Sequence, residues 1–194
     1  MRSTTSRLLP EGLARLFGRQ GFAHGVHPPQ AKADTAAQPI RQFPFAPLMI
    51  VPLSQHAGQP ARPVVRAGQD VLRGELIAEP DGAMSVAMHA PASGRIAGIE
   101  LAPSISGRMQ PAIFLQPHPG STQEAIEGVP CDVERASREE ILRAIQWAGI
   151  VGLGGAAFPT HVKLAPPPGK PLDTLVINGV ECEPYLSTDH RVML

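Results

Sequence analysis

Residues 64–79 read VVRAGQDVLRGELIAE, and residues 89–96 read HAPASGRI. In both stretches, short runs of apolar residues alternate with turn residues, such as the Ala-Gly-Gln-Asp at 67–70 and the Pro-Ala-Ser-Gly at 91–94. Short apolar runs separated by Gly- and Pro-rich turns predict β-strands. The pattern extends in both directions, and the predicted strands cover residues 48–53, 63–66, 71–78, 85–89, 94–101 and 112–116. Many short strands at regular spacing predict a sandwich or a barrel.

The two quoted stretches resemble the barrel-sandwich hybrid fold of biotinyl and lipoyl domains. In that fold, an AGxxVxxGxxL segment and an APxSG segment mark tight turns of a flattened barrel. These carrier domains bear a modified lysine at a hairpin tip, but the hairpin at 81–88 has no lysine, and the chain has only Lys32, Lys163 and Lys170. The β module is therefore expected to be a scaffold, or a docking surface for other subunits, rather than a carrier.

The rest of the chain divides around this module. Residues 1–46 are expected to form an irregular arm, because repeated prolines interrupt any long helix, with one short amphipathic helix over 11–19. The β domain is placed at 47–117, and an α/β domain is expected to begin within 118–194. The fold class is therefore α+β. Fewer than 60 residues follow Ser137, too few to close a doubly wound sheet, so the chain is expected to be a fragment.

The expected α/β domain opens with a clear helix signal. Ser137 and Glu140 form a capping box, apolar residues follow at helical spacing, and Gly149 provides a stop. A glycine-rich loop then leads to Pro159, which suits the first turn of a new helix. Residues 172–178 are expected to form a buried strand, and 185–194 to begin another helix. Alternating helices and strands indicate an α/β arrangement.

Composition excludes several kinds of function. The 194 residues carry 17 basic and 17 acidic side chains, a balance that argues against a nucleic-acid-binding protein. No apolar run reaches the roughly 18 residues that span a bilayer. The two cysteines, Cys131 and Cys182, are far apart and are expected to be reduced. Because no C-x-x-C occurs, no iron–sulfur or zinc site of that kind is expected within the chain.

Residues 152–163 read GLGGAAFPTHVK, and residues 178–184 read NGVECEP. Glycines let backbone N–H groups approach a phosphate, a helix N-terminus adds positive charge, and Lys163 offers a point charge. The acidic segment follows a predicted strand, where open α/β sheets bind ligands. Taken alone, the first segment is equally compatible with a plain helix–helix connection. Either glutamate of the second segment, taken alone, favours a solvated acidic turn.

Together, these segments resemble the flavin loop GxGGAGFPTxxK and the NxxExEP turn of the NADH-binding subunit of respiratory complex I. The C subunit of the Rnf-type ion-translocating electron transport complex shares both. It also shares two earlier features of this chain, GVHPPQAK at 25–32 and IVPLSQHAG at 50–58. Four motifs in the same order span nearly the whole sequence. The chain is therefore identified as resembling the N-terminal part of an Rnf C subunit.

The resemblance implies specific roles for eight residues. Three glycines of the loop would line the phosphate and ring of FMN, while two polar residues would contact FMN. Phe158 would stack on the nicotinamide or adenine side of NADH, and two carboxylates would lie near the nicotinamide and ribose. The glycines are Gly152, Gly154 and Gly155, the polar residues are Lys163 and Asn178, and the carboxylates are Glu181 and Glu183. The chain departs from the complex I pattern at Ala157, which replaces a glycine, and at Val180, which replaces an acidic residue.

The resemblance also implies a place in a larger assembly. In the family, NADH reduces FMN, and two [4Fe–4S] clusters in a C-terminal half carry the electrons onward. The partners would be other subunits of the complex, on the cytoplasmic side of the bacterial inner membrane, and contact with the membrane would occur only through them. Two alternatives stay open at this point. The chain could be a non-catalytic docking or assembly module built on the β domain, or an FMN-free relative that binds a quinone or another subunit.

Overall fold

The computed structural model describes residues 28–41, 43–104, 107–128, 130–153, 155–165, 169, 173–174, 176–177, 181 and 183–194. The chain forms two compact units. One is Arg41–Ile177, and the other combines Met1–Ile40 with Asn178–Leu194. Each unit is described by itself below.

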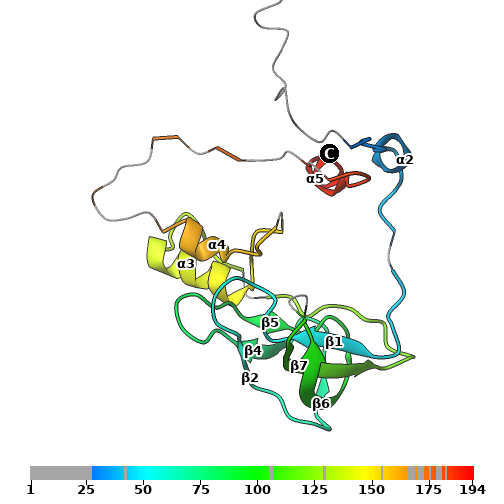
Figure 1. Ribbon diagram of the computed structural model, residues 1–194. Helices are drawn as coiled ribbons and strands as arrows, with labels where there is room; N and C mark the ends of the chain where they lie inside the picture. Colours follow the sequence, from blue (N-terminus) through cyan, green and yellow to red (C-terminus); the bar gives the residue numbers. More distant parts are fainter. Residues whose placement is uncertain are drawn as a thin grey trace, which may run out of the picture. The chain divides into compact units, whose positions relative to one another are not determined.

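The larger unit contains a flattened barrel of two antiparallel sheets (Figure 1). The four-stranded sheet has the order β1-β7-β6-β3, and the three-stranded sheet has the order β2-β4-β5. The strands are β1 (Met49–Pro52), β2 (Arg62–Pro63), β3 (Asp70–Val71), β4 (Leu76–Glu79), β5 (Met88–His89), β6 (Gly94–Pro103) and β7 (Met109–Pro117). This arrangement confirms the predicted barrel-sandwich hybrid.

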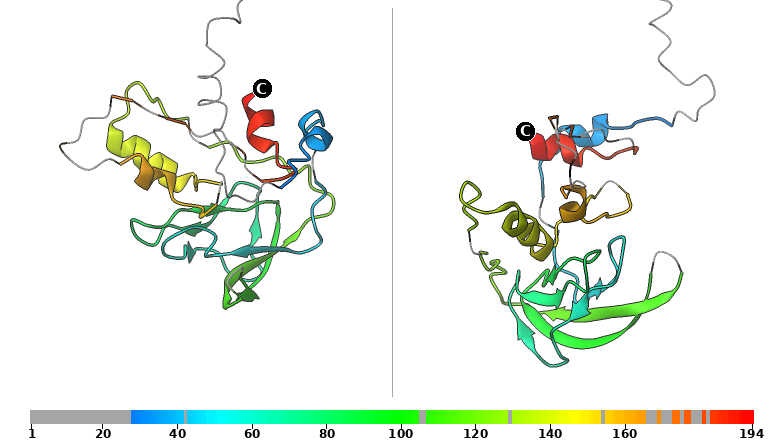
Figure 2. Two further views of the ribbon diagram at one scale, coloured as in Figure 1. Left: turned by 45° about the horizontal axis from the view of Figure 1, so that its top comes forward. Right: turned by 90° about the vertical axis from the view of Figure 1, so that its left-hand side faces the viewer.

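Alternating side chains of the strands build a single apolar core. In β6 and β7, which form a long curved hairpin (Figure 2), Ile96 lies opposite Leu115 and both are fully buried. A register shift between Ile96 and Gly98 lets the hairpin curl, as β-bulges do. The core residues are Val51, Leu53, Ala61, Val65, Val71, Ile77, Ala78, Met88, Ala90, Ala92, Ile96, Ile113 and Leu115.

The predicted single strand over 71–78 is wrong, because a turn divides it into β3 and β4. The Glu75 N–H donates to the Leu72 carbonyl at 3.0 Å, and the Leu72 N–H donates to the Glu75 carboxylate at 2.9 Å. Gly74 has a φ of 87°, a conformation that costs glycine little. Side-chain and backbone bonds therefore close a turn inside a sequence that is rich in strand-forming residues.

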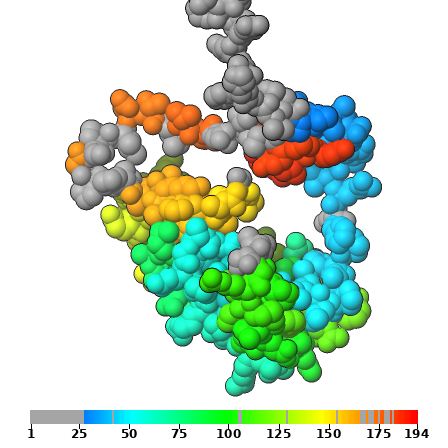
Figure 3. Space-filling view, in the orientation of Figure 1, coloured from blue at the N-terminus to red at the C-terminus, as the bar shows by residue number. Residues whose placement is uncertain are grey.

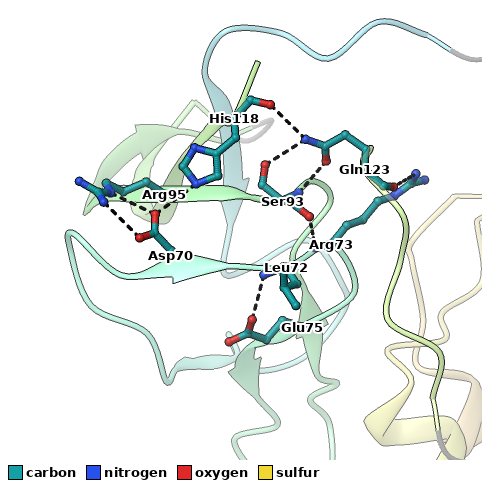
Figure 4. A network of polar contacts seen from close by, with 8 residues as sticks. All are labelled: Asp70, Leu72, Arg73, Glu75, Ser93, Arg95, His118 and Gln123. Atoms are coloured by element: carbon teal, nitrogen blue, oxygen red, sulfur yellow. Dashed lines mark hydrogen bonds and ion pairs between the residues drawn. The ribbon is translucent and has the colours of Figure 1, made fainter. Parts of the chain in front are cut away.

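The segment after β7 folds back along the barrel and is fastened by Gln123 (Figure 4). The Gln123 side-chain amide accepts from the Ser93 N–H at 2.7 Å and donates to the Ser93 carbonyl at 3.0 Å. Arg73 donates to the Gln123 carbonyl at 3.0 Å. Close by, Arg95 and His118 both contact the Asp70 carboxylate, and the pKa of Asp70 is lowered, chiefly by its hydrogen bond from Arg95.

Helix α3 (Arg138–Trp147) begins with the predicted capping box. The Glu140 carboxylate accepts from the Ser137 N–H at 2.7 Å, and the Ser137 hydroxyl accepts from the Glu140 N–H at 3.3 Å. The pKa of Glu140 is lowered mainly by its bond from the Ser137 backbone. The helix stops before Gly149, which has a φ of 74°. The prediction for both ends of α3 is confirmed, because local bonds determine them.

The predicted buried strand over 172–178 is wrong for the residues that the structure describes there. None of residues 173, 174, 176 and 177 lies in a strand, and the side chains of Val176 and Ile177 are 85% and 80% exposed. A strand needs a neighbour to satisfy its backbone groups, and no described residue pairs with this segment. Apolar composition alone therefore gave a misleading signal.

Among its described residues, the smaller unit has two short helices, α2 (Ala33–Ala36) and α5 (Thr188–Met193). The helix expected from residue 185 is thus present but begins at Thr188, whereas the one expected over 11–19 lies outside the described residues. Across the part of the chain that the structure describes, no helix has both the length and the apolar character needed to cross a membrane.

Candidate functional site

The glycine-rich segment forms a closed loop between α3 and α4 (Thr160–Lys163). An antiparallel bridge between Val151 and Pro159 forms its stem. Inside this stem, the Gly152 N–H donates to the Phe158 carbonyl at 2.9 Å. The loop tip reaches into solvent, since Leu153 is 91% exposed. Helix α4 is a single turn, so the positive charge expected from a helix N-terminus is small here.

A lysine ammonium lies against the base of this loop. Lys163 follows on α4, and its Nζ is close enough to Gly152 that a Cβ at that position would collide with it. The same ammonium is 6.0 Å from the centre of the Phe158 ring, at the outer limit of a cation–π contact. The structure thus brings together three residues predicted for the site, Gly152, Phe158 and Lys163.

The loop backbone adopts conformations that favour glycine. Gly155 has a φ of 151°, and the space where a Cβ would lie is open. Ala157 has a φ of 47° although it carries a side chain. This is the position at which the complex I pattern has glycine, so the departure seen in the sequence falls on a strained residue.

A pocket of about 230 Å³ lies below the loop, between the barrel and the end of α3. Burial lowers the pKa of two histidines that line it, His56 and His89. The His56 Nε2 lies 3.0 Å from the Gln59 carbonyl, so the neutral ring carries its proton there and donates. Its Nδ1 is buried and has no hydrogen-bond partner among the described residues. The lining residues are Val51, Gln55, His56, Val86, Ala87, Met88, His89, Ala148, Gly149 and Val151.

The acidic turn belongs to the smaller unit. The Glu181 carboxylate accepts from the backbone N–H groups of Asp189 at 3.0 Å and His190 at 3.4 Å, at the start of α5. Partial desolvation works against ionisation of Glu181, but these backbone bonds and the nearby Lys32 ammonium outweigh it, so its pKa is lowered. Glu183 is exposed.

An N-terminal segment holds this turn. The Lys32 ammonium donates to the Glu181 carbonyl, and the Thr35 hydroxyl donates to the Tyr185 carbonyl at 2.6 Å. The Tyr185 N–H donates to the Gln30 carbonyl at 2.9 Å. Two motifs that are about 150 residues apart in sequence, at 25–32 and 178–184, therefore meet. The sequence had indicated Lys32 only as part of a family motif, with no role at the turn.

The eight predicted residues thus fall into three groups. Gly152, Gly155 and Phe158 lie in the loop of the larger unit with Lys163 on the adjoining α4, and Glu181 and Glu183 belong to the smaller unit. Gly154 and Asn178 lie outside the described residues, as does Cys182. Cys131 is an exposed free thiol. Within the described ranges, no group of three or more His, Cys, Asp or Glu residues is arranged to hold a metal ion.

Two family models match different parts of the chain. Residues 20–119 match the family described as the RnfC barrel sandwich hybrid domain, and residues 145–194 match the Nuo51 FMN-binding domain. The chain is 42% identical over 177 residues to the C subunit of the proton-translocating ferredoxin:NAD(+) oxidoreductase complex of Clostridium ljungdahlii, covering 90% of this chain and 38% of that protein.

Two further relatives agree. The C subunit of the Na(+)-translocating ferredoxin:NAD(+) oxidoreductase complex of Acetobacterium woodii is 40% identical over 89% of this chain and 39% of its own length. The C subunit of the ion-translocating oxidoreductase complex of Pseudomonas aeruginosa is 46% identical over 89% of this chain and 22% of its own length. The chain spans less than two fifths of the length of these relatives.

The fold defines a barrel-sandwich hybrid protein, and the part of the chain at 145–194 is similar to the Nuo51 FMN-binding domain. More particularly, the chain belongs to the family of the C subunits of Rnf-type ion-translocating oxidoreductase complexes.

Proposed function

We propose that this chain supplies the barrel and the flavin loop of an electron-transfer subunit that oxidises NADH through FMN. The observation that carries the proposal is the Lys163 ammonium lying against the base of an exposed glycine loop. A cation beside backbone that has no intervening Cβ suits a phosphate group. The relatives are named as subunits of ferredoxin:NAD(+) oxidoreductase complexes, which supports the same chemistry.

The residues present fit an FMN phosphate. Gly152 leaves room for the Lys163 ammonium, and the open space beside Gly155 exposes the backbone to a ligand. Gly152, Gly154 and Gly155 would line the phosphate and ring of FMN, and Lys163 and Asn178 would contact FMN. When bound, FMN would supply the chemistry that accepts a hydride and releases electrons singly.

The acidic turn would serve the nicotinamide side. Glu181 and Glu183 offer carboxylate oxygens, which accept hydrogen bonds from ribose hydroxyls or from a carboxamide. Phe158 would provide an apolar surface for a ring of NADH. Glu181, whose pKa is lowered from 4.5, is ionised at neutral pH as glutamates ordinarily are, and so is an acceptor.

The activity of the whole protein is part of the proposal. Electrons would pass to [4Fe–4S] clusters in a C-terminal part, and the other subunits of the complex would be the partners. The complex would place this subunit on the cytoplasmic side of the bacterial inner membrane, peripherally. The alternatives, an assembly module or an FMN-free relative, predict a full-length protein that purifies without flavin.

The test is flavin stoichiometry in the full-length protein, followed by bleaching of the flavin absorbance by NADH. Gly152→Val should strongly reduce bound FMN, because its side chain displaces the Lys163 ammonium. Gly120→Val is the matched control, since no atom outside its neighbours lies within 4 Å of a Cβ there. Glu183→Gln should keep FMN but slow its reduction by NADH. Wild-type protein without FMN, or full FMN in Gly152→Val, would contradict the assignment.

A further inference from the structure

The tip of the barrel, residues 80–87 between β4 and β5, is occupied by another part of the same chain. At the end of α3, the Gln146 side-chain amide donates to the carbonyls of Gly82 at 3.1 Å and Ser85 at 2.9 Å. The Gln146 carbonyl in turn accepts from the Ala87 N–H at 3.1 Å. One residue of α3 therefore makes three hydrogen bonds to the tip.

Helix α4 is attached to the same tip. The His161 Nε2 lies 2.8 Å from the Ala83 carbonyl, so in the neutral ring Nε2 carries the proton and donates. Its Nδ1 is buried, without a partner among the described residues. Because His161 and Lys163 share one helical turn, the bond from His161 also fixes the backbone that carries the lysine.

The loop between these helices is attached too. The Ala57 N–H, at the end of the 50–58 motif, donates to the Ala157 carbonyl at 3.2 Å. Gly149, where α3 ends, lies so close to the barrel that a Cβ would approach the Ala87 carbonyl oxygen to 2.5 Å. In Figure 3, the gold atoms of the loop and α4 rest directly on the cyan and green atoms of the barrel.

The glycine loop is thus held at both ends and at Ala157 by a barrel with a buried core. A loop that is already ordered loses less conformational entropy when a ligand binds, so its affinity rises. Second-layer hydrogen bonds act in this way on binding residues in general. The tip that presents a modified lysine in carrier domains has, in this chain, carbonyl groups that bond to α3 and α4.

We propose that the barrel tip is a clamp for the flavin loop, and that Gln146 and His161 are positioning residues for FMN. They would do this through their bonds to the tip, which hold the loop. The inference rests on the proposed function and adds to it a role for the barrel, which the family resemblance leaves as a scaffold or docking surface.

The test compares two glutamines in the full-length protein. Gln146→Ala removes two side-chain bonds to the barrel at the loop, and Gln123→Ala removes two side-chain bonds to Ser93, at the folded-back segment. Titration with FMN should give a dissociation constant about tenfold higher for Gln146→Ala, and within about twofold of wild type for Gln123→Ala. His161→Ala should behave like Gln146→Ala, and His161→Gln, which keeps a donor, should recover part of the affinity. Equal affinities for the two glutamine variants would overturn the proposal.

A second readout is independent of flavin. Hydrogen exchange of the Gly152 amide, which bonds to Phe158, should become about tenfold faster in Gln146→Ala and stay unchanged in Gln123→Ala. If wild-type protein binds no FMN but this difference appears, the clamp stands and the proposed function fails. If the Gly152 amide exchanges alike in all variants, the clamp is wrong whether or not FMN binds. Should Gln146→Ala not fold, the pair His161→Ala and His161→Gln decides by the same exchange.

Discussion

The glycine loop of the larger unit and the acidic turn of the smaller unit are held in different ways. Hydrogen bonds from Gln146, His161 and Ala57 attach the loop to a barrel whose core side chains are almost fully buried. The turn is held by a few bonds to an N-terminal segment, and neither α2 nor α5 contains a buried residue. Regions with few buried contacts open at lower free energy than core elements. We therefore expect the loop to share the stability of the barrel, and the turn to open locally.

The largest change in the difference in stability between loop and turn should come from a substitution in the barrel core. Leu115 is fully buried between β1 and β6, so Leu115→Ala should cost about 3 kcal/mol of unfolding free energy. The Gly152 amide should then exchange as fast as the barrel amides, whereas amides of the acidic turn should not change. Leu153→Ala, at an exposed loop position, is the control and should cost less than about 0.5 kcal/mol. Native-state hydrogen exchange of the full-length protein measures both.

Acidification should lower the unfolding free energy of the barrel by less than Leu115→Ala does. Burial lowers the pKa of His56 and His89 from 6.5 in the folded state, so the unfolded chain binds protons first as the pH falls. Unfolding free energy should therefore be constant above pH 6.5 and decrease below it, until the folded state also takes up protons. The double variant His56→Gln, His89→Gln should show a flatter profile in denaturant titrations between pH 7.5 and about 5. An unchanged slope would contradict this account of the pocket.

The stability of the acidic turn should depend on the Lys32 side chain. Lys32→Met removes the ammonium that donates to the Glu181 carbonyl, a change of about 1 kcal/mol that is confined to the smaller unit. The Tyr185 amide, which bonds to Gln30, should exchange about fivefold faster, and the Gly152 amide should be unaffected. Lys32→Arg, which keeps a donor, serves as the control. Faster exchange at both amides would mean that the two regions open together.

The smallest effect is expected at Ala157, whose φ of 47° strains an alanine. Ala157→Gly relieves this strain, which is worth about 1–2 kcal/mol, but it adds freedom to the unfolded chain. The net gain in unfolding free energy should be about 0.5 kcal/mol, visible as a higher denaturation midpoint. Ala156→Gly, a neighbour without positive φ, should be destabilising. A loss of stability in Ala157→Gly would show that the strain is absent.

Local signals in the sequence predicted the structure well. The capping box at Ser137 and the stop at Gly149 were readable because each depends on bonds between near neighbours. Most turns of the barrel could be predicted for the same reason, but the one at 72–75 was missed because strand-forming residues surround Gly74. The strands predicted over 63–66 and 85–89 were also too long, since β2 covers only Arg62–Pro63 and β5 only Met88–His89. The strand expected over 172–178 failed because a strand depends on a partner that apolar composition does not reveal.

The hydrogen bonds that hold the loop could not be predicted from the sequence. Gln146 and His161 bond to carbonyls 61 to 78 residues away, and any exposed polar residue on a helix would look the same in sequence. Gly152, Phe158 and Lys163 were predicted because their motif is contiguous. The 50–58 motif indicated the family but no contact. In the structure, its Ala57 N–H bonds to Ala157 of the glycine loop.

The Ala57 amide reports directly on whether the barrel holds the loop that we propose to bind FMN. This amide belongs to the barrel side but donates to Ala157 in the loop. Adding FMN to the full-length protein should slow its hydrogen exchange by about tenfold, while the Leu53 amide, which bonds to Pro111 within the barrel, should not change. FMN that binds and slows the loop amides without any effect at Ala57 would contradict the claim.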